Sequence, residues 1–381
     1  MQTDRSRKQV PQVPESEEMS SSTSPEPEPS SPQREKQHHQ EDRIPRTMNN
    51  YKKLITFSDN NLLFDHVLKC YSAIEEGFSI YAPMPSFLNP HLMEQDNQYS
   101  FGAIEIKSGE NQLLDVKYRR SATTHTERVS CTNIDETLQR CRTEVKNMYM
   151  FTLYSPCLMR GHKIDKKDKD KEPCMLHLLE KAYQWYSEFG IKTRVFFKKP
   201  WGLSGPDIFK GLLYSDVSRT SSAFHPYVDL CKEHRFKLDN KFRQDNKAIF
   251  RLIGKVNRKE TLKKRIKSTL RKLQEKAKEG LKKCQHLKRG LRYIDSLKFP
   301  KKVHKQIIKT FKNNWKTLVN HSSMSLIIEK ITSDFNNAEV KLFVRDLRLD
   351  LGDSGYFQIN QVPPGAEVEE GDYVQVMNTS F

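Results

Sequence analysis

The sequence lacks long apolar runs. Only 36% of its 381 residues are hydrophobic and 30% are charged, and no window approaches the roughly 18 consecutive apolar residues that a membrane-spanning helix needs. We therefore expect no transmembrane segment, and we expect part of the chain to lie outside any hydrophobic core. The length is typical of two ordered units with tails, because one domain usually holds about 100–200 residues.

An apolar segment near the N-terminus is also lacking. Residues 1–10 are polar and basic and no apolar stretch follows them, which argues against a secretory signal peptide. Cysteines are few, and their seven positions are widely spaced: 70, 131, 141, 157, 174, 231 and 284. An odd number of scattered cysteines is typical of reduced thiols, some of them free to bind metal. We therefore expect an intracellular protein, in the nucleus or the cytoplasm.

The positive charge that is present is concentrated in one segment. Residues 241–316 contain 27 Lys and Arg against 5 Asp and Glu, a local net charge of +22, whereas the rest of the chain has a net charge of −5. Basic side chains neutralise phosphates and release counterions, which gives affinity without sequence choice. We expect this segment to bind nucleic acid, with single-stranded DNA or RNA as the partner. An anionic membrane surface, an acidic protein or a merely solvated helix face are the alternatives.

Composition and apolar periodicity divide the chain into four parts. Residues 1–46 are rich in Ser, Pro, Glu and Gln and are expected to form a disordered tail. An α/β domain is expected over 51–235, followed by a basic helical region over 241–335. The remainder, 336–381, is expected to be a small β-containing segment with an acidic tail.

The expected elements follow from the spacing of apolar residues. In the α/β domain we predict helices over about 62–77, 125–145 and 174–189, and strands over 101–107, 113–118, 148–154 and 192–197. The first two strands flank a short Gly-bearing link and are predicted to form a hairpin. In the basic region we predict one long helix with a single apolar stripe over 262–294, a second helix after Pro300, and then short strands over 340–344 and 373–376.

Three residues of this α/β domain could bind a metal. A catalytic zinc site takes three His or Cys ligands and leaves a fourth position open for water. His125, Cys157 and Cys174 supply such a set. His125 precedes a predicted helix, Cys157 follows Pro156 at the end of a predicted strand, and Cys174 begins the next helix, where the helix N-terminus favours a thiolate. Glu127 is placed to exchange protons with water rather than to bind the metal.

These residues resemble the motifs of a known family. His125-x-Glu127 and Pro156-Cys157, preceded by residues 151–155, are similar to the H-x-E and P-C-x-x-C motifs of the zinc-dependent nucleobase deaminases, in particular the AID/APOBEC-like branch. The similarity covers roughly residues 62–228. It implies a deaminase-like mixed β-sheet sandwiched by helices, Zn²⁺ bound by His125, Cys157 and Cys174, and Glu127 as the catalytic proton carrier.

The same resemblance implies two substrate residues. Ser155 belongs to the Ser-Pro-Cys turn, and Trp201 follows the strand at 192–197, where such enzymes stack an aromatic side chain on a base beside the target. The sequence departs from the family at one point, because sixteen residues rather than two separate Cys157 from Cys174. Such an insertion is tolerable because loop-closure entropy grows only with the logarithm of length. It introduces His162 as a rival third ligand, and it could act as a lid.

The expected function is hydrolytic deamination of cytosine to uracil in single-stranded nucleic acid that the basic region holds. A deaminase of free cytidine or nucleotides is the first alternative, since it would use the same site without the basic region. A non-catalytic nucleic-acid-binding protein is the second. It would use the basic helices alone, with the cysteines in a core and His125 on a helix surface. Five further histidines, at 225, 234, 286, 304 and 321, have no partners at ligand spacing and are expected to be structural.

Overall fold

The computed structural model describes residues 59–74, 77–88, 98–114, 116–118, 125–141, 144–159, 172–203, 205–238, 249–250, 253, 259–352 and 355–364. Three predictions lie outside these residues: the disordered tail 1–46, the strand at 373–376 with its acidic neighbours, and the rival ligand His162. Within the described ranges, no helix is both long and apolar enough to cross a membrane.

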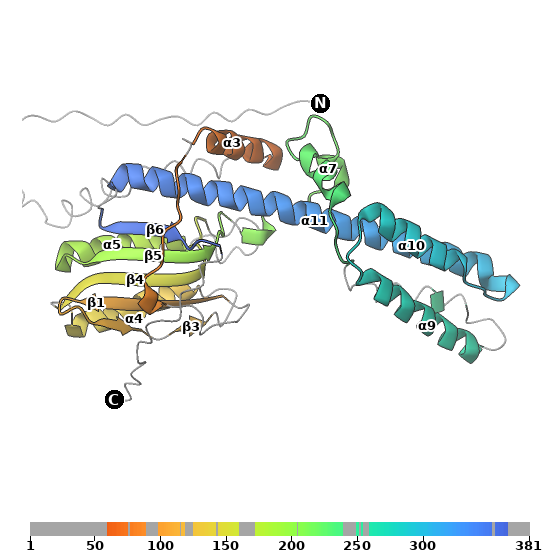
Figure 1. Ribbon diagram of the computed structural model, residues 1–381, viewed down its shortest axis with the longest axis horizontal. Helices are drawn as coiled ribbons and strands as arrows, with labels where there is room; N and C mark the ends of the chain where they lie inside the picture. The colour runs from red at the N-terminus through yellow and green to blue at the C-terminus, as the bar shows by residue number, and fades with distance from the viewer. Residues whose placement is uncertain are drawn as a thin grey trace, which may run out of the picture. The chain divides into compact units, whose positions relative to one another are not determined.

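A mixed β-sheet forms the centre of the α/β fold (Figure 1). Its strands lie in the order β2 (Asn111–Leu113), β1 (Tyr99–Ile106), β4 (Val145–Tyr154), β5 (Lys192–Lys199) and β6 (Phe357–Gln361), and β3 (Lys117–Tyr118) also pairs with β1. β1 is antiparallel to its neighbours, whereas β4, β5 and β6 run parallel. The α/β class is therefore confirmed. The predicted hairpin is present, but its second strand is split into β2 and β3.

Local sequence signals explain the helices around this sheet. α3 (Asn60–Ser72) begins after Asp59, whose carboxylate accepts the amide hydrogens of Asn61 and Leu62. α4 (Thr126–Cys141) leads into β4, and α5 (Cys174–Phe189) connects β4 to the parallel β5. Gly190 ends α5 in the left-handed conformation, with φ of 70°, as its position predicted. The shorter helices are the 3-10 helices η1 (Ser86–Leu88) and η4 (Gly205–Asp207) and the α-helices α6 (Tyr214–Val217) and α7 (His225–Glu233).

Alternate strand residues face two different layers. On one side Ile104, Met150 and Phe197 pack into a core with residues of α3, α4 and α5. On the other side Phe101, Phe151 and Phe196 form a smaller cluster with Leu88 of η1. This period-two alternation is what a sheet buried on both faces requires.

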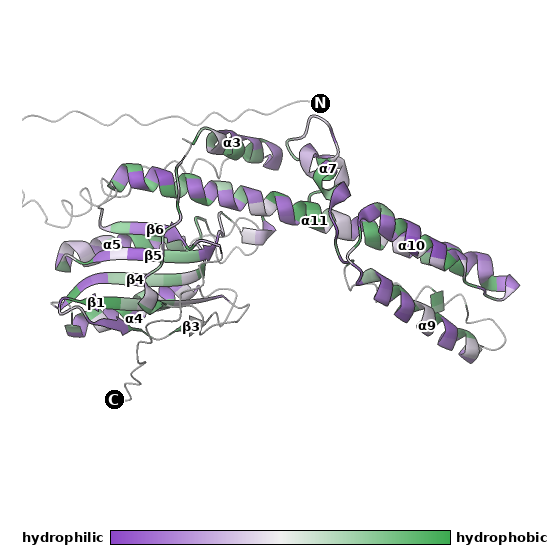
Figure 2. Ribbon diagram, in the orientation of Figure 1, coloured by the Kyte–Doolittle hydropathy of each residue, from purple (hydrophilic) through white to green (hydrophobic). Residues whose placement is uncertain are grey.

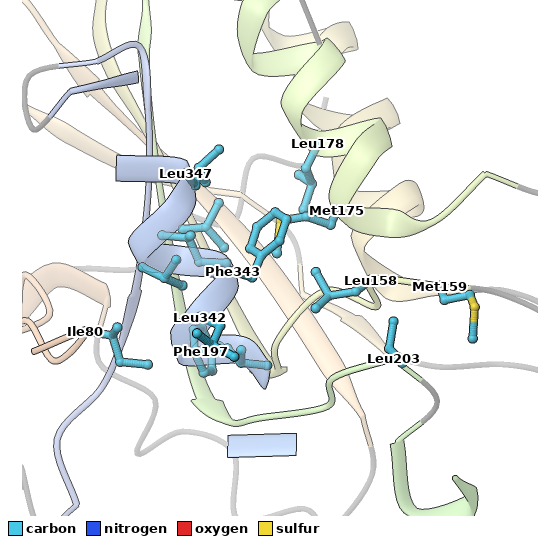
Figure 3. Packing of buried hydrophobic residues seen from close by; sticks show 14 of the residues in the cluster. Ile80, Leu158, Met159, Met175, Leu178, Phe197, Leu203, Leu342, Phe343 and Leu347 are labelled. Carbon is cyan, nitrogen blue, oxygen red and sulfur yellow. The ribbon is translucent and has the colours of Figure 1, made fainter. Parts of the chain in front are cut away.

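Helix α11 (Lys301–Leu351) runs for 51 residues and ends shortly before β6. Its second half lies in the same core as α5, because Phe343 and Leu347 belong to one cluster with Met175 and Leu178 (Figure 3). The strand predicted at 340–344 is wrong, because apolar residues at 331, 335, 338 and 342 keep the helical spacing. The expected boundary between 335 and 336 falls inside this helix.

The basic helices are consequently inserted within the α/β fold rather than appended to it. They occur in the connection between β5 and β6, two adjacent parallel strands. This insertion explains why the sequence does not predict β6, because 157 residues lie between the end of its partner β5 and the start of β6.

The inserted helices build a second core. α9 (Lys259–Ala277) and α10 (Lys283–Asp295) bury residues of the predicted apolar stripe, including Ile266, Leu273 and Ile294, against Phe311 and other residues of the first half of α11. Figure 2 shows hydrophilic and hydrophobic residues alternating along α9 and α10. The prediction of one continuous helix is wrong, since the chain turns at Gly280 and Leu281 then pairs antiparallel with Phe236.

Candidate active site and metal centre

Three predicted ligands meet at one end of the sheet. The Nδ1 atom of His125 lies 3.2 Å from the Sγ of Cys174 and 3.6 Å from the Sγ of Cys157. The ligand atoms of all three residues lie within 4.8 Å of one another, and no other such group of His, Cys, Asp and Glu occurs among the described residues. The long insertion has therefore not separated the two cysteines.

The elements that carry these residues explain their convergence. His125 directly precedes α4, Cys157 lies three residues beyond the end of β4, and Cys174 is the first residue of α5. Pro173 leaves the α5 N-terminus without a side-chain cap. Cys157 takes this place, because its Sγ accepts a hydrogen bond from Cys174 N at 3.3 Å and its carbonyl oxygen accepts one from Met175 N at 3.2 Å.

The surroundings of Cys157 favour the thiolate form of its side chain. Although this side chain is buried, the pKa of the thiol lies well below its ordinary value. The side-chain hydrogen bond with Cys174 is the largest cause, the neighbouring His125 adds to it, and the backbone N–H of Cys174 contributes less. A thiolate is the form that binds metal, so the electrostatics of the pocket favour a bound cation.

Glu127 lies in the first turn of α4, is only 1% exposed and is not a member of the three-residue ligand group. Its carboxylate oxygens accept hydrogen bonds from Gln98 Nε2 and Thr126 Oγ1, both at 3.3 Å. Burial raises the pKa of this carboxyl, and the negative charge of Cys157 raises it further. Glu127 therefore holds a proton more readily than an exposed glutamate.

Ser155 and Trp201 lie in contact. Ser155 is 2% exposed, and its Oγ accepts a hydrogen bond from the backbone N–H of Trp201 at 2.8 Å. The Trp201 ring packs edge-to-face on Tyr154, with ring centroids 5.2 Å apart. The Ser155 hydroxyl therefore fixes the chain at Trp201, and Trp201 presents an aromatic surface beside the end of β4.

A cavity of about 940 Å³ lies next to this aromatic pair. One wall comes from Tyr154, Trp201 and residues 205–214, and the other from α11 between His321 and Asn336. Its lining carries two basic and two acidic side chains, Lys199, Lys210, Asp207 and Glu329, and Lys210 pairs with Asp207. The metal ligands do not line this cavity, so it is a neighbouring feature rather than the reaction pocket itself.

Sequence reasoning missed the contribution of α11 to this region. Asn336 and Glu339 contact the segment that carries Trp201, although they lie more than 130 residues further along the chain. It also missed Arg128, whose Nη2 donates to the backbone oxygen of Glu172 at 2.7 Å and so anchors the returning end of the insertion beside α4. Long-range contacts of this kind leave no periodic signal in the sequence. The structural role expected for His286 is present, because its buried Nε2 bonds the Phe236 carbonyl oxygen at 2.8 Å.

The fold and the site together define a class of protein. His125 and Glu127 at the start of α4, Cys157 after β4 and Cys174 at the start of α5 are similar to the H-x-E and P-C-x-x-C arrangement of nucleobase deaminases, except that sixteen residues separate the two cysteines. Residues 89–241 match the model of the family described as Secreted Novel AID/APOBEC-like Deaminase 3. The match confirms the resemblance to the AID/APOBEC-like branch and supports a deaminase.

The matched segment contains His125, Glu127, Cys157 and Cys174 and stops before α9. No curated protein and no solved structure matches the chain. The word "Secreted" in the family's description is at odds with the intracellular location expected from the sequence.

Proposed function

We propose that the protein is a zinc-dependent hydrolytic deaminase that converts cytosine to uracil in single-stranded nucleic acid. One observation carries this proposal: His125 Nδ1 and the Sγ atoms of Cys157 and Cys174 converge beside a buried glutamate that is not among them. This is the ligand set and the general acid-base residue that hydrolytic deamination needs.

The donor atoms fit zinc. One imidazole nitrogen and two sulfurs, at least one of them a thiolate, are ligands that Zn²⁺ prefers, and three protein ligands leave a position for water. When bound, the metal supplies Lewis acidity that lowers the pKa of water to about 7. His125, Cys157 and Cys174 are the residues that would hold it.

Glu127 would move the protons. The overall reaction consumes cytosine and water and yields uracil and ammonia, so both protons of water must pass to the base, one to N3 and one to the departing amine. Glu127 would accept each proton and deliver it to these nitrogens, and its burial excludes bulk water as a competing acceptor. Gln98 and Thr126 orient the carboxylate through their hydrogen bonds.

The single-stranded nucleic acid would be held by the basic helices. The four acidic side chains of residues 259–316 all take part in ion pairs with Lys or Arg: Glu260, Glu275, Glu279 and Asp295. Exposed basic side chains on α9 and α10, among them Lys267, Arg271, Lys288 and Arg292, are available for phosphates. Trp201 would stack on a base next to the target.

The decisive experiment compares wild-type protein with Glu127→Gln on a cytosine-containing single-stranded oligonucleotide, with uracil as the readout. We expect conversion by the wild type and its loss in the variant, which should retain its zinc. Cytidine as a second substrate tests the first alternative. Charge-neutralising variants of α9 test the basic segment and leave α11, which belongs to both cores, intact. Cytidine conversion with no oligonucleotide conversion would overturn the polynucleotide substrate.

We also propose an intracellular location, which the family's description does not support. The observation behind it is that the cysteines are free thiols, including buried Cys131 and Cys231. Fractionation of cells that express the full chain tests this proposal. Recovery of the protein from the medium would contradict it.

A further inference from the structure

The metal-ligand segment and the segment that follows β5 are joined by two hydrogen bonds, one on each side of Cys157. We call residues 201–203 and 205 the Trp201 segment. Trp201 N donates to Ser155 Oγ at 2.8 Å, and Leu158 N donates to the Gly202 carbonyl oxygen at 3.2 Å. Any displacement of the Trp201 segment therefore acts on the backbone that presents the Cys157 thiolate.

Helix α11 holds the Trp201 segment from its other side. The backbone N–H of Leu203 donates to Glu339 Oε2 at 2.7 Å, and Asn336 Nδ2 donates to the Gly205 carbonyl oxygen at 3.1 Å. Glu339 is 0% exposed, so water does not compete for its contact, and Asn336 is 5% exposed. Leu158, Leu203 and Phe343 belong to one packed cluster around these bonds (Figure 3).

The approach between helix and segment is close. Gly202 has a φ of 64°, and a Cβ atom at this position would lie 2.6 Å from both Asn336 Oδ1 and Glu339 Oε2. Only glycine allows the backbone to adopt this conformation so near to two polar side chains. A carboxyl group without exposure to water is costly compared with an apolar side chain. Packing of α11 alone would therefore not call for Glu339.

We propose that Glu339 is a positioning residue of the deaminase site: it fixes the Trp201 segment through the Leu203 N–H, and through that segment it fixes residues 155–158, which carry Cys157. This inference rests on the proposed function for its catalytic part. Its structural part, the immobilisation of the Trp201 segment, stands independently of any substrate.

Two substitutions separate the hydrogen bond from the packing. Glu339→Gln keeps an oxygen acceptor for Leu203 N–H, whereas Glu339→Leu removes the acceptor at similar volume. Val344→Ala is the matched control, since Val344 is buried on the same helix but lines a different cavity of about 360 Å³. For each full-length variant we would measure amide hydrogen exchange of residues 199–206, zinc content, thermal stability, and kcat and KM on the cytosine oligonucleotide.

In Glu339→Leu we expect faster exchange at Leu203 and a fall in kcat on the order of tenfold to a hundredfold, with zinc retained. Glu339→Gln should stay close to the wild type in both properties, and Val344→Ala should lose stability without either effect. If Glu339→Leu does not fold, Asn336→Ala removes the bond to Gly205 and should give a smaller change of the same pattern.

The inference is overturned if folded Glu339→Leu keeps wild-type exchange at Leu203, or if Val344→Ala loses as much kcat at equal thermal stability. A wild-type protein that deaminates no substrate overturns the proposed function instead, and the exchange data still decide whether Glu339 immobilises the Trp201 segment.

Discussion

The backbone N–H of Cys174 donates a hydrogen bond to the Sγ of Cys157, so one predicted ligand caps the helix that the other begins. This relationship gives Cys157 two tasks, metal binding and helix capping. The side chain of Cys174 is also in the ligand group, but at the start of α5 it is the backbone N–H of Cys174 that is capped. Substitution of Cys157 should therefore lower the free energy of unfolding more than substitution of Cys174.

We predict that Cys157→Ala and Cys174→Ala both abolish zinc binding, and that Cys157→Ala is the less stable variant without metal. Its free energy of unfolding should be lower by about a further 1 kcal/mol, the usual contribution of an N-cap to stability. Metal analysis and thermal unfolding after chelator treatment measure the two effects. Cys231→Ala serves as the control, because Cys231 is buried outside the ligand group and should leave zinc content unchanged. Equal stability of the two metal-free variants would contradict the capping role of Cys157.

The candidate site could be predicted from the sequence because its signals are local. Pro156, Pro173 and Gly190 mark the ends of a strand and a helix, and they placed Cys157 and Cys174 at element boundaries, where the structure also has them. The H-x-E motif is likewise local, because His125 and Glu127 lie within the first turn of one helix or directly before it. The structure adds that the sixteen-residue insertion leaves the two sulfurs in contact distance of His125.

The end of the fold could not be predicted in the same way. Residues 340–344 are apolar and buried except for Lys341, and short apolar runs do not distinguish a buried helix from a strand. β6 has only five residues, and its pairing with β5 is a contact across a long insertion. The hydrogen bond from Leu203 to Glu339 is equally non-local, so no pattern pointed to Glu339.

Burial of Glu339 predicts a pH dependence of stability. Burial raises the pKa of this carboxyl from 4.5 to about 8. Between these values the folded chain binds more protons than the unfolded chain, so the free energy of unfolding should fall as pH rises. This contribution is complete below the unfolded pKa and is lost as pH passes the folded value. Urea unfolding across the window measures the slope.

Glu339→Gln isolates this contribution. The variant has no titrating carboxyl at this position, and its free energy of unfolding should decline less with pH than that of the wild type. Glu180 also contributes to the wild-type slope, because burial and Glu172 raise its pKa to about 7. The difference between wild type and Glu339→Gln removes this shared background. Parallel pH profiles for the two proteins would show that Glu339 does not titrate as its burial predicts.

The second core should be destabilised by any side chain larger than hydrogen at Gly290. A Cβ atom here would overlap the Trp315 ring, whose Nε1 donates to the His286 carbonyl oxygen at 2.9 Å. Gly290→Ala should therefore destabilise the protein by about 1–3 kcal/mol, the usual cost of overpacking. Gly280→Ala is the matched control, because no atom lies within 4 Å of its Cβ position and this substitution should be neutral or stabilising. Thermal unfolding compares them, and equal melting temperatures would refute the close packing of Gly290 on Trp315.

The basic helices should give binding to single-stranded nucleic acid that weakens with salt. Lys267 and Arg271 are exposed and lie one turn apart on α9. If both contact phosphates, Lys267→Gln with Arg271→Gln should reduce the slope of log affinity against log salt concentration by about 1.4, since each contact with a single strand contributes about 0.7. Fluorescence anisotropy of a labelled oligonucleotide across a salt series measures this slope. Lys69→Gln, at an exposed position on α3, is the control and should leave the slope unchanged. An unchanged slope in the double variant, together with binding to anionic vesicles, would favour a membrane surface as the partner of these helices.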